Sequence, residues 1–144
     1  MIYKTFFCYT DGGCSGNANP NLKERKMIMT VADQHGDLIE MDFEEGGSNN
    51  IAEILAIRNA IKYAIQYDHE VICIKSDSMN SLRWLDSALY SPYPKVGKNI
   101  NDPERTLKLL AEIKELSKKI DLYIKWVPRD ENLAGHIIEE HYGL

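Results

Sequence analysis

The hydrophobic pattern of this chain first changes from the period of strands to that of helices at residues 46–47, and this change limits the folds that the chain can adopt. Before it, residues 2–10 and 26–32 are rich in aromatic and β-branched side chains, and residues 38–44 alternate apolar with acidic ones. An Asp-Gly-Gly sequence at residues 11–13 breaks the first of these segments. The first third of the chain is therefore predicted to be an antiparallel meander of three strands.

Helical spacing follows this change. Apolar residues recur three and four positions apart from Ile54 to Ile65, which predicts a helix over residues 50–67. The apolar run at residues 70–76 is typical of a strand that is buried on both faces. The other predicted elements are helices over Ser78–Leu89, from the cap Asp102 and Pro103 onward and over residues 132–141, and a strand over residues 121–127.

The predicted order of elements is βββαβααβα, which places the chain in the α/β class. Because helices separate the first, fourth and fifth strands, these three are expected to run parallel. The prediction is a five-stranded mixed sheet, an antiparallel meander plus two parallel strands, with helices on both faces. A length of 144 residues, with 44% apolar and 27% charged residues, fits one globular domain over residues 1–144.

Charge and cysteine content narrow the class of protein. The 17 basic and 22 acidic residues give a net charge of −5, which argues against a broad basic face for nucleic acid but does not say where the charges lie. There are three cysteines, Cys8, Cys14 and Cys73, and their spacing matches no zinc-binding motif. An odd number of cysteines suits a reducing compartment. The N-terminal segment is not a signal peptide, and there is no run of about 18 apolar residues. We therefore expect a cytoplasmic monomer with no membrane association.

Three acidic residues are expected at one edge of the predicted sheet. Asp11 ends the first strand and Asp77 ends the fourth, and parallel neighbouring strands bring their carboxyl ends together. Glu53, in the first turn of the helix at residues 50–67, would lean over the same edge. Converging carboxylates repel one another without a cation, and their oxygen atoms favour Mg²⁺ or Mn²⁺ over zinc. Two such ions about 4 Å apart would activate a water and stabilise the leaving oxygen in phosphodiester hydrolysis.

Each acid alone also has a purely structural interpretation. Asp11 could belong only to an Asp-Gly turn, and Glu53 could complement the helix dipole. Asp77 could cap the helix that follows it. The hypothesis of a metal site depends on the three acids together.

Four motifs are distributed along the chain: YTDGGCSGNANP at residues 9–20, SNNIAE at 48–53, KSDSMNS at 75–81 and WVPRDENLAGH at 126–136. Together, and in this order, they resemble the motifs of type 1 ribonucleases H. The Val-Pro-Arg form of the last motif is similar to the plant-like and reverse-transcriptase-associated branch of that family. No single motif is specific, but their combination over nearly the whole chain is.

The resemblance implies the ribonuclease H-like fold and metal-dependent endonucleolytic cleavage of the RNA strand of RNA–DNA hybrids, giving 5′-phosphate and 3′-hydroxyl ends. Asp11, Glu53 and Asp77 match the family's metal-binding acids, which hold two Mg²⁺ or Mn²⁺ ions per site. An A-like duplex is read through its 2′-hydroxyls and wide minor groove, for which amide groups and Asn side chains suffice without positive charge. Asn49 and Asn50 alternatively cap the helix. The family's substrate-contacting positions correspond to Gly12, Gly13, Cys14, Asn17, Ser48, Asn49 and Asn50.

The final motif departs from the family at its fourth acid, where this chain has His136. A neutral imidazole still binds a metal, Mn²⁺ somewhat better than Mg²⁺, so His136 is predicted as a fourth catalytic and metal-binding residue. The alternatives are that His136 is a surface residue of an impaired enzyme, or that Glu139 or Glu140 takes its place. The preceding loop lacks the family's common His, and Arg129 in this loop is expected to contact phosphate.

These departures keep a second hypothesis open, a catalytically impaired ribonuclease H-like module that binds nucleic acid. An exonuclease of the same superfold fits less well, because those enzymes usually carry an Asp-x-Glu pair on the first strand. Trp126, in the last predicted strand, is expected in the core.

Overall fold

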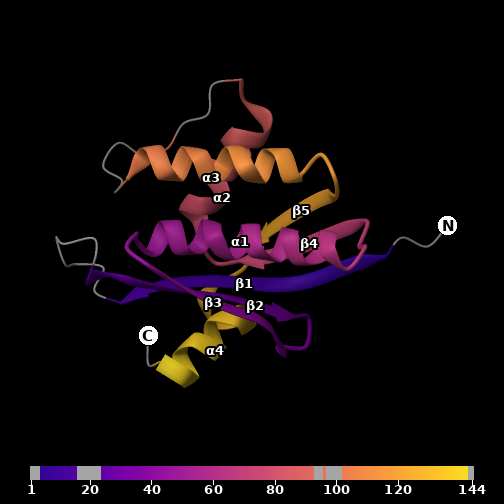
Figure 1. Cartoon of the computed structure of the whole chain (residues 1–144). Coiled ribbons are helices and arrows are strands. Elements are labelled where there is room, and N and C mark those ends of the chain that lie inside the picture. Colours follow the sequence, from indigo (N-terminus) through magenta and orange to yellow (C-terminus); the bar gives the residue numbers. More distant parts are fainter. Residues whose placement is uncertain (1–3, 16–23, 93–95, 97–101, 143–144) are drawn as a thin grey trace.

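Five strands form one mixed sheet through the middle of the molecule (Figure 1). The computed structural model describes residues 4–15, 24–92, 96 and 102–142. The strands β1, β2 and β3 pair antiparallel, whereas β4 pairs parallel with both β1 and β5. The predicted meander plus two parallel strands is therefore confirmed. In sheet order the strands are β3 (Leu38–Glu45), β2 (Lys26–Asp33), β1 (Thr5–Ser15), β4 (Val71–Ser76) and β5 (Asp121–Trp126).

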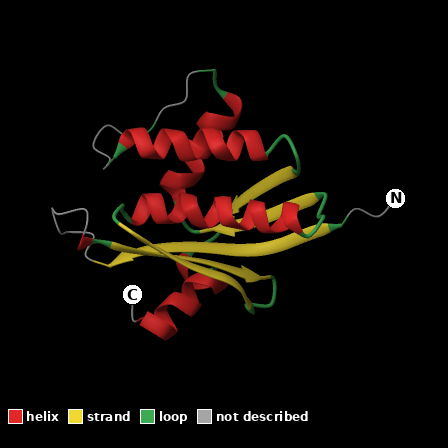
Figure 2. Cartoon of the chain, in the orientation of Figure 1, coloured by secondary structure: helices red, strands yellow, loops and turns green. Residues whose placement is uncertain are grey.

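Helices cover both faces of the sheet, as predicted (Figure 2). The helix α1 lies along the sheet with α3 packed on it, and α4 lies on the opposite face against β1 and β2 (Figure 1). None of the helices in the described ranges is both long enough and apolar enough to span a membrane. The helices are α1 (Asn49–Gln66), α2 (Met79–Tyr90), α3 (Pro103–Leu116) and α4 (Leu133–Tyr142), and a short 3-10 turn, Arg129–Glu131, precedes α4.

Polar side chains determine where the helices begin. Ser48 caps α1, because its hydroxyl accepts a hydrogen bond from the backbone N–H of Ile51 at 3.2 Å. Asp102 caps α3 in the predicted way, with Pro103 at the start of the helix. Since Ser48 holds the capping position of α1, the alternative that Asn49 or Asn50 caps this helix is wrong.

The strand β1 is longer than predicted and carries Asp11 inside it. The strand was expected to break before Gly12, but it continues to Ser15 by pairing with β2, while its parallel pairing with β4 stops at Tyr9. A β-carbon at Gly12 would lie 2.2 Å from the carbonyl carbon of Ala52 in α1, so only glycine fits. The Asp-Gly-Gly sequence therefore marks a close approach of α1 to β1, and its interpretation as a turn is wrong.

The strand β4 is buried on one face, not on both as predicted. Ile72 and Ile74 are buried in the core under α1. Lys75, the next residue of the strand, is exposed. The difference arises because the helix on the other face, α4, packs against β1 and β2. A run of apolar residues indicates that a strand is buried, but it does not indicate whether a helix covers its second face.

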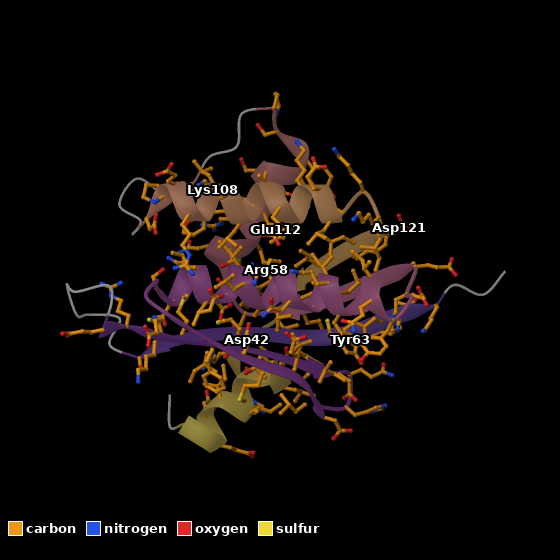
Figure 3. The ribbon with its side chains drawn as sticks, viewed as in Figure 1. Asp42, Arg58, Tyr63, Lys108, Glu112 and Asp121 are labelled. Carbon is orange, nitrogen blue, oxygen red and sulfur yellow. The ribbon has the colours of Figure 1, made fainter. Side chains whose placement is uncertain are left out.

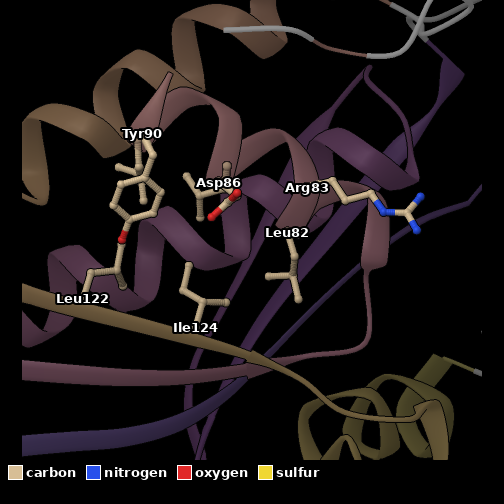
Figure 4. A pocket seen from close by; sticks show the side chains of 8 residues that line it. Leu82, Arg83, Asp86, Tyr90, Leu122 and Ile124 are labelled. Carbon is tan, nitrogen blue, oxygen red and sulfur yellow. The ribbon is translucent and has the colours of Figure 1, made fainter. Parts of the chain in front are cut away.

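Two features of the helical layer lie away from the edge of the sheet where the acids were expected. Arg58 of α1 and Glu112 of α3 form an ion pair with a distance of 3.7 Å (Figure 3). A hollow of about 320 Å³ lies between α2 and β5 (Figure 4), and none of the three predicted acids lines it. Its walls include Leu82, Arg83, Asp86, Tyr90, Leu122 and Ile124.

Candidate metal centre

Three carboxylates from distant parts of the sequence meet at one edge of the sheet. Asp11 lies in β1, Asp77 directly follows β4, and Glu53 is the fifth residue of α1, just beyond the first turn in which it was predicted. Because β1 and β4 are parallel neighbours, side chains near their ends share one edge of the sheet. One ligand oxygen of each carboxylate lies within 4.8 Å of the others.

Hydrogen bonds fix Glu53 in this cluster. Its Oε1 accepts the backbone N–H of Gly12 at 2.7 Å, and its Oε2 accepts the hydroxyl of Ser76 at 3.5 Å. Glu53 is buried, and the first turn of its helix is capped by Ser48 and holds no acidic residue. The close approach of α1 to Gly12 therefore places the Glu53 carboxylate in the site. A residue that only complemented the helix dipole would not need this position.

Burial makes two of the carboxylates, those of Asp11 and Glu53, hard to ionise. Asp11 is 1% exposed, and burial raises its pKa to about 6 even though a hydrogen bond with Glu53 and the charge of Arg129 act in the opposite direction. Burial, reinforced by the charge of Asp11, raises the pKa of Glu53 well above its ordinary value. A cation between the acids would lower both pKa values, so the electrostatics of the cluster favour a bound positive ion.

Arg129 brings one positive charge to the cluster. Its Nη1 donates to both oxygens of Asp11, at 3.1 and 3.2 Å, and to Oδ2 of Asp77 at 3.2 Å. Its Nη2 lies 3.3 Å from Glu139 of α4. Burial alone would lower the pKa of Arg129, but the surrounding carboxylates outweigh burial and raise it. The predicted contact with phosphate stays a prediction, and the contacts that the structure shows are with acids.

Two residues that were not predicted as site residues hold Asp77 in place. Asn132 is fully buried, and its Nδ2 donates to the carbonyl of Thr10 at 2.9 Å and to Oδ1 of Asp77 at 3.2 Å. Trp126 was expected in the core but is 43% exposed, and its indole N–H donates to the carbonyl of Asp77 at 3.3 Å. The place of Asn132 in the final motif was the available signal, whereas nothing in the strand pattern distinguished Trp126.

A cavity of about 470 Å³ opens over the acids. Inside it, Oδ1 of Asn49 accepts the backbone N–H of Cys14 at 2.8 Å and so joins α1 to β1. Ser48 is not part of this lining and caps α1, and Asn17 lies outside the described residues. The lining consists of the predicted substrate-binding residues Gly12, Gly13, Cys14, Asn49 and Asn50, the acids Asp11, Glu53 and Asp77, and Ser78, Arg129 and Ile138.

His136, the predicted fourth ligand, lies near the start of α4 and is partly buried. Its backbone N–H donates to the carbonyl of Asn132 at 3.2 Å. Within the described part of the chain, the group of ligand atoms that could hold a metal comprises the three carboxylates and not His136. On α4 the acid joined to the site is Glu139, through Arg129. The role of His136 as a ligand therefore stays a prediction.

The residues present suit a hard divalent cation. Carboxylate oxygens are the ligands that Mg²⁺ and Mn²⁺ prefer, and three of them within 4.8 Å provide a set that one ion can share. Asp11, Glu53 and Asp77 would hold such an ion, and the bonds to Gly12 and Asn132 already fix two of these carboxylates.

Comparisons with solved structures agree with this fold. The N-terminal RNase H domain of rv2228c from Mycobacterium tuberculosis superposes with a TM-score of 0.66 at 18% identity, covering 92% of this chain and 94% of that one. RNase H1 from the halophilic archaeon Halobacterium salinarum NRC-1 gives a TM-score of 0.63 at 20% identity over 92% of both chains. LC11-RNase H1, isolated from compost by a metagenomic approach and solved in complex with an RNA/DNA hybrid, gives 0.58 at 19% identity over 88% of both.

Identities this low establish a shared fold alone, and a comparison with curated proteins finds no match. The sequence model of the family described as RNase H, however, matches residues 3–136, nearly the whole chain. The resemblance seen in the four motifs is thereby confirmed, and the chain belongs to the RNase H family.

Proposed function

We propose that this chain is a metal-dependent endoribonuclease that hydrolyses the RNA strand of RNA–DNA hybrids and leaves 5′-phosphate and 3′-hydroxyl ends. The observation that carries the proposal is the cluster of Asp11, Glu53 and Asp77, gathered beneath an open cavity at the edge of the sheet. Membership of the RNase H family supports the reaction type. A structural relative solved with an RNA/DNA hybrid supports the choice of substrate.

The proposed cofactor is a pair of Mg²⁺ or Mn²⁺ ions, held by Asp11, Glu53 and Asp77 with His136 as a fourth ligand. When bound, such ions activate a water and stabilise the leaving oxygen. The protein itself positions the carboxylates that would bind these ions. It holds Asp11 and Glu53 almost completely buried, where charge acts more strongly than in water, and it fixes them before substrate arrives.

The lining of the cavity suits a duplex that is recognised without a basic surface. Asn50 and Ser78 bring polar side chains to it, and the backbone of Gly13 lies beside them. An A-like duplex presents 2′-hydroxyls along a wide minor groove, which such groups can recognise. By family correspondence Asn17 and Ser48 complete the substrate-binding set. A net charge of −5 is compatible with this mode of recognition because base edges and sugars, not only phosphates, would be contacted.

Labelled RNA–DNA hybrid, RNA duplex and DNA duplex should be incubated with the protein in Mg²⁺, in Mn²⁺ and in EDTA. We expect the hybrid alone to be cleaved, only with metal, and end analysis to find 5′-phosphates. Asp11→Asn and Asp77→Asn should each lower the rate by at least about 100-fold. Asp121→Asn is the matched control, since Asp121 is exposed at the start of β5 and should leave the rate unchanged.

A second candidate is a module that binds hybrids without cleaving them. It is favoured by Arg129, whose guanidinium pairs with two of the acids, and by His136 in place of a fourth acid. Hybrid binding without metal-dependent cleavage of any substrate would replace the enzyme by this module. A His136→Ala variant whose rate keeps the same dependence on metal concentration would remove His136 from the proposed ligands.

A further inference from the structure

We propose that Arg129 is a tethered cation that competes with the divalent metal ion for Asp11 and Asp77, and so sets the metal affinity of the site. The inference rests on the proposed function, because it assumes that these acids bind metal. Arg129 lies 118 residues from Asp11 in sequence, yet its side chain contacts both of these acids at once.

The guanidinium and a shared ion would need the same oxygen atoms. Nη1 of Arg129 lies 3.1 and 3.2 Å from the two oxygens of Asp11 and 3.2 Å from Oδ2 of Asp77. An ion shared by these carboxylates would bind oxygen atoms that the guanidinium now contacts. The divalent ion and the guanidinium, bound to the same carboxylates, would also repel each other. Occupation by a metal ion therefore requires Arg129 to move away.

Arg129 has a second partner to which it can move. Its Nη2 already lies 3.3 Å from Oε1 of Glu139 on α4, and this carboxylate is 48% exposed. The side chain of Arg129 is itself 50% exposed, so its movement would not disturb the core. Glu139 would keep the guanidinium beside the site after a metal ion has displaced it, which makes the exchange reversible.

Gly135 lies beside the guanidinium of Arg129 and has no side chain to crowd it. A β-carbon on Gly135 would lie 3.2 Å from Oδ2 of Asp11 and 3.5 Å from Cζ of Arg129. A larger side chain would therefore crowd this corner of the site. With glycine there, Asp11 faces Arg129 directly.

The test is a titration of the full chain with Mn²⁺ alone, following the free-ion signal by electron paramagnetic resonance. Arg129→Gln removes the competing charge, and we expect it to bind Mn²⁺ at least about 10-fold more tightly than the unaltered protein, the scale of one charge-assisted pair. Arg129→Lys keeps a charge without the planar fork and should fall between the two. Arg58→Gln is the charge-matched control, because Arg58 pairs with Glu112 between α1 and α3, and it should bind Mn²⁺ like the unaltered protein.

Glu139→Gln tests the second position of the guanidinium. Without Glu139, Arg129 has fewer partners outside the acids, so Mn²⁺ affinity should fall about 3-fold or more. In the Arg129→Gln background the same change should alter affinity less than 2-fold, because no guanidinium remains to be held. An equal effect in both backgrounds would show that Glu139 acts only through its own charge and would overturn its part in the proposal.

Far-UV circular dichroism of each variant establishes that it is folded before titration. An Mn²⁺ affinity of folded Arg129→Gln that is within 2-fold of the unaltered protein, or weaker, would overturn the competition. That failure is distinguishable from failure of the proposed function, because hybrid cleavage that is lost in Asp11→Asn would still stand. Loss of the function instead requires that the unaltered protein cleaves no hybrid at any metal concentration.

Discussion

Replacing Asp11 by asparagine is expected to stabilise the metal-free protein while it removes the proposed activity. Burial raises the pKa of Asp11 from an ordinary value of 3.8 to about 6 in the folded protein. Because the folded pKa is the higher one, the folded state binds the proton more strongly than the unfolded chain does. The stability that the protonated carboxyl contributes is therefore fully present below about pH 4 and is lost as the pH rises through about 6.

The size of the effect follows from these two values. A difference of about 2 in pKa corresponds to ~3 kcal/mol of unfolding free energy once the pH exceeds both values. The attraction of Arg129 is already included, since it acts on the folded pKa. Asparagine has nearly the same shape and cannot ionise. We therefore expect Asp11→Asn to raise the unfolding free energy by ~3 kcal/mol at pH 7.5 and by ~1 kcal/mol at pH 4.5.

Urea unfolding in EDTA, followed by circular dichroism at both pH values, measures this difference. Asp121→Asn, which alters an exposed acid at the start of β5, should change stability by less than ~0.5 kcal/mol at either pH. Saturating Mg²⁺ should reduce the advantage of Asp11→Asn, because the ion stabilises the protein that keeps the carboxylate. An equal gain at both pH values, or no gain at pH 7.5, would refute the reasoning.

Three further variants test the structure around the site. Gly12→Ala should fail to give soluble folded protein or lose more than ~3 kcal/mol of unfolding free energy, because its β-carbon would lie 2.2 Å from a backbone carbon of α1. A melting temperature equal to that of the parent would contradict this contact. Asn132→Ala should lose ~2–3 kcal/mol in urea unfolding and weaken Mn²⁺ binding, because the carbonyl of Thr10 and the carboxylate of Asp77 both lose a donor. Asp102→Ala should lose ~1–2 kcal/mol with unchanged hybrid cleavage, because the cap of α3 has a φ of 52° that alanine disfavours, whereas Asp102→Asn should lose much less.

The order of elements and the meeting of the acids could be predicted because their signals are local or topological. The helical spacing from Ile54 to Ile65 extends over several turns, and α1 lies within one residue of the range predicted from it. Asp11 and Asp77 were placed together because helical crossovers make parallel neighbours, and β1 and β4 are such neighbours. Neither inference needed knowledge of which side chains touch.

The errors arose where burial depends on neighbours that are distant in sequence. Asp-Gly-Gly is an ordinary turn signal, and only the contact between Gly12 and Ala52 shows why glycine lies inside a strand here. Trp126 was assigned to the core by its side chain, but β5 is an edge strand and its last residue is partly open to solvent. Position within a sheet is a property of the whole fold, and the sequence of one strand does not contain it.

The contacts of Arg129 could not be predicted for the same reason. The residue belongs to the final motif, but its distance from Asp11, which lies inside β1, depends on where the fold places the 3-10 turn before α4. The final motif predicts a phosphate beside Arg129, and the structure shows carboxylates there. A cation and an acid cluster were each identifiable from the chain, whereas their pairing required the fold.

The hydrogen bonds within the site bear on the choice between an enzyme and a module that only binds. The N–H of Gly12 would be satisfied by a glutamine in place of Glu53, and Nδ2 of Asn132 would find an acceptor in an asparagine in place of Asp77. Neutral amides would thus keep these bonds and relieve the repulsion, and they would not repel the phosphates of a bound strand. Two divalent ions would add four positive charges, change the formal net charge from −5 to −1 and make this edge attractive to phosphate. The negative charges therefore favour the proposed metal-dependent hydrolysis over binding alone.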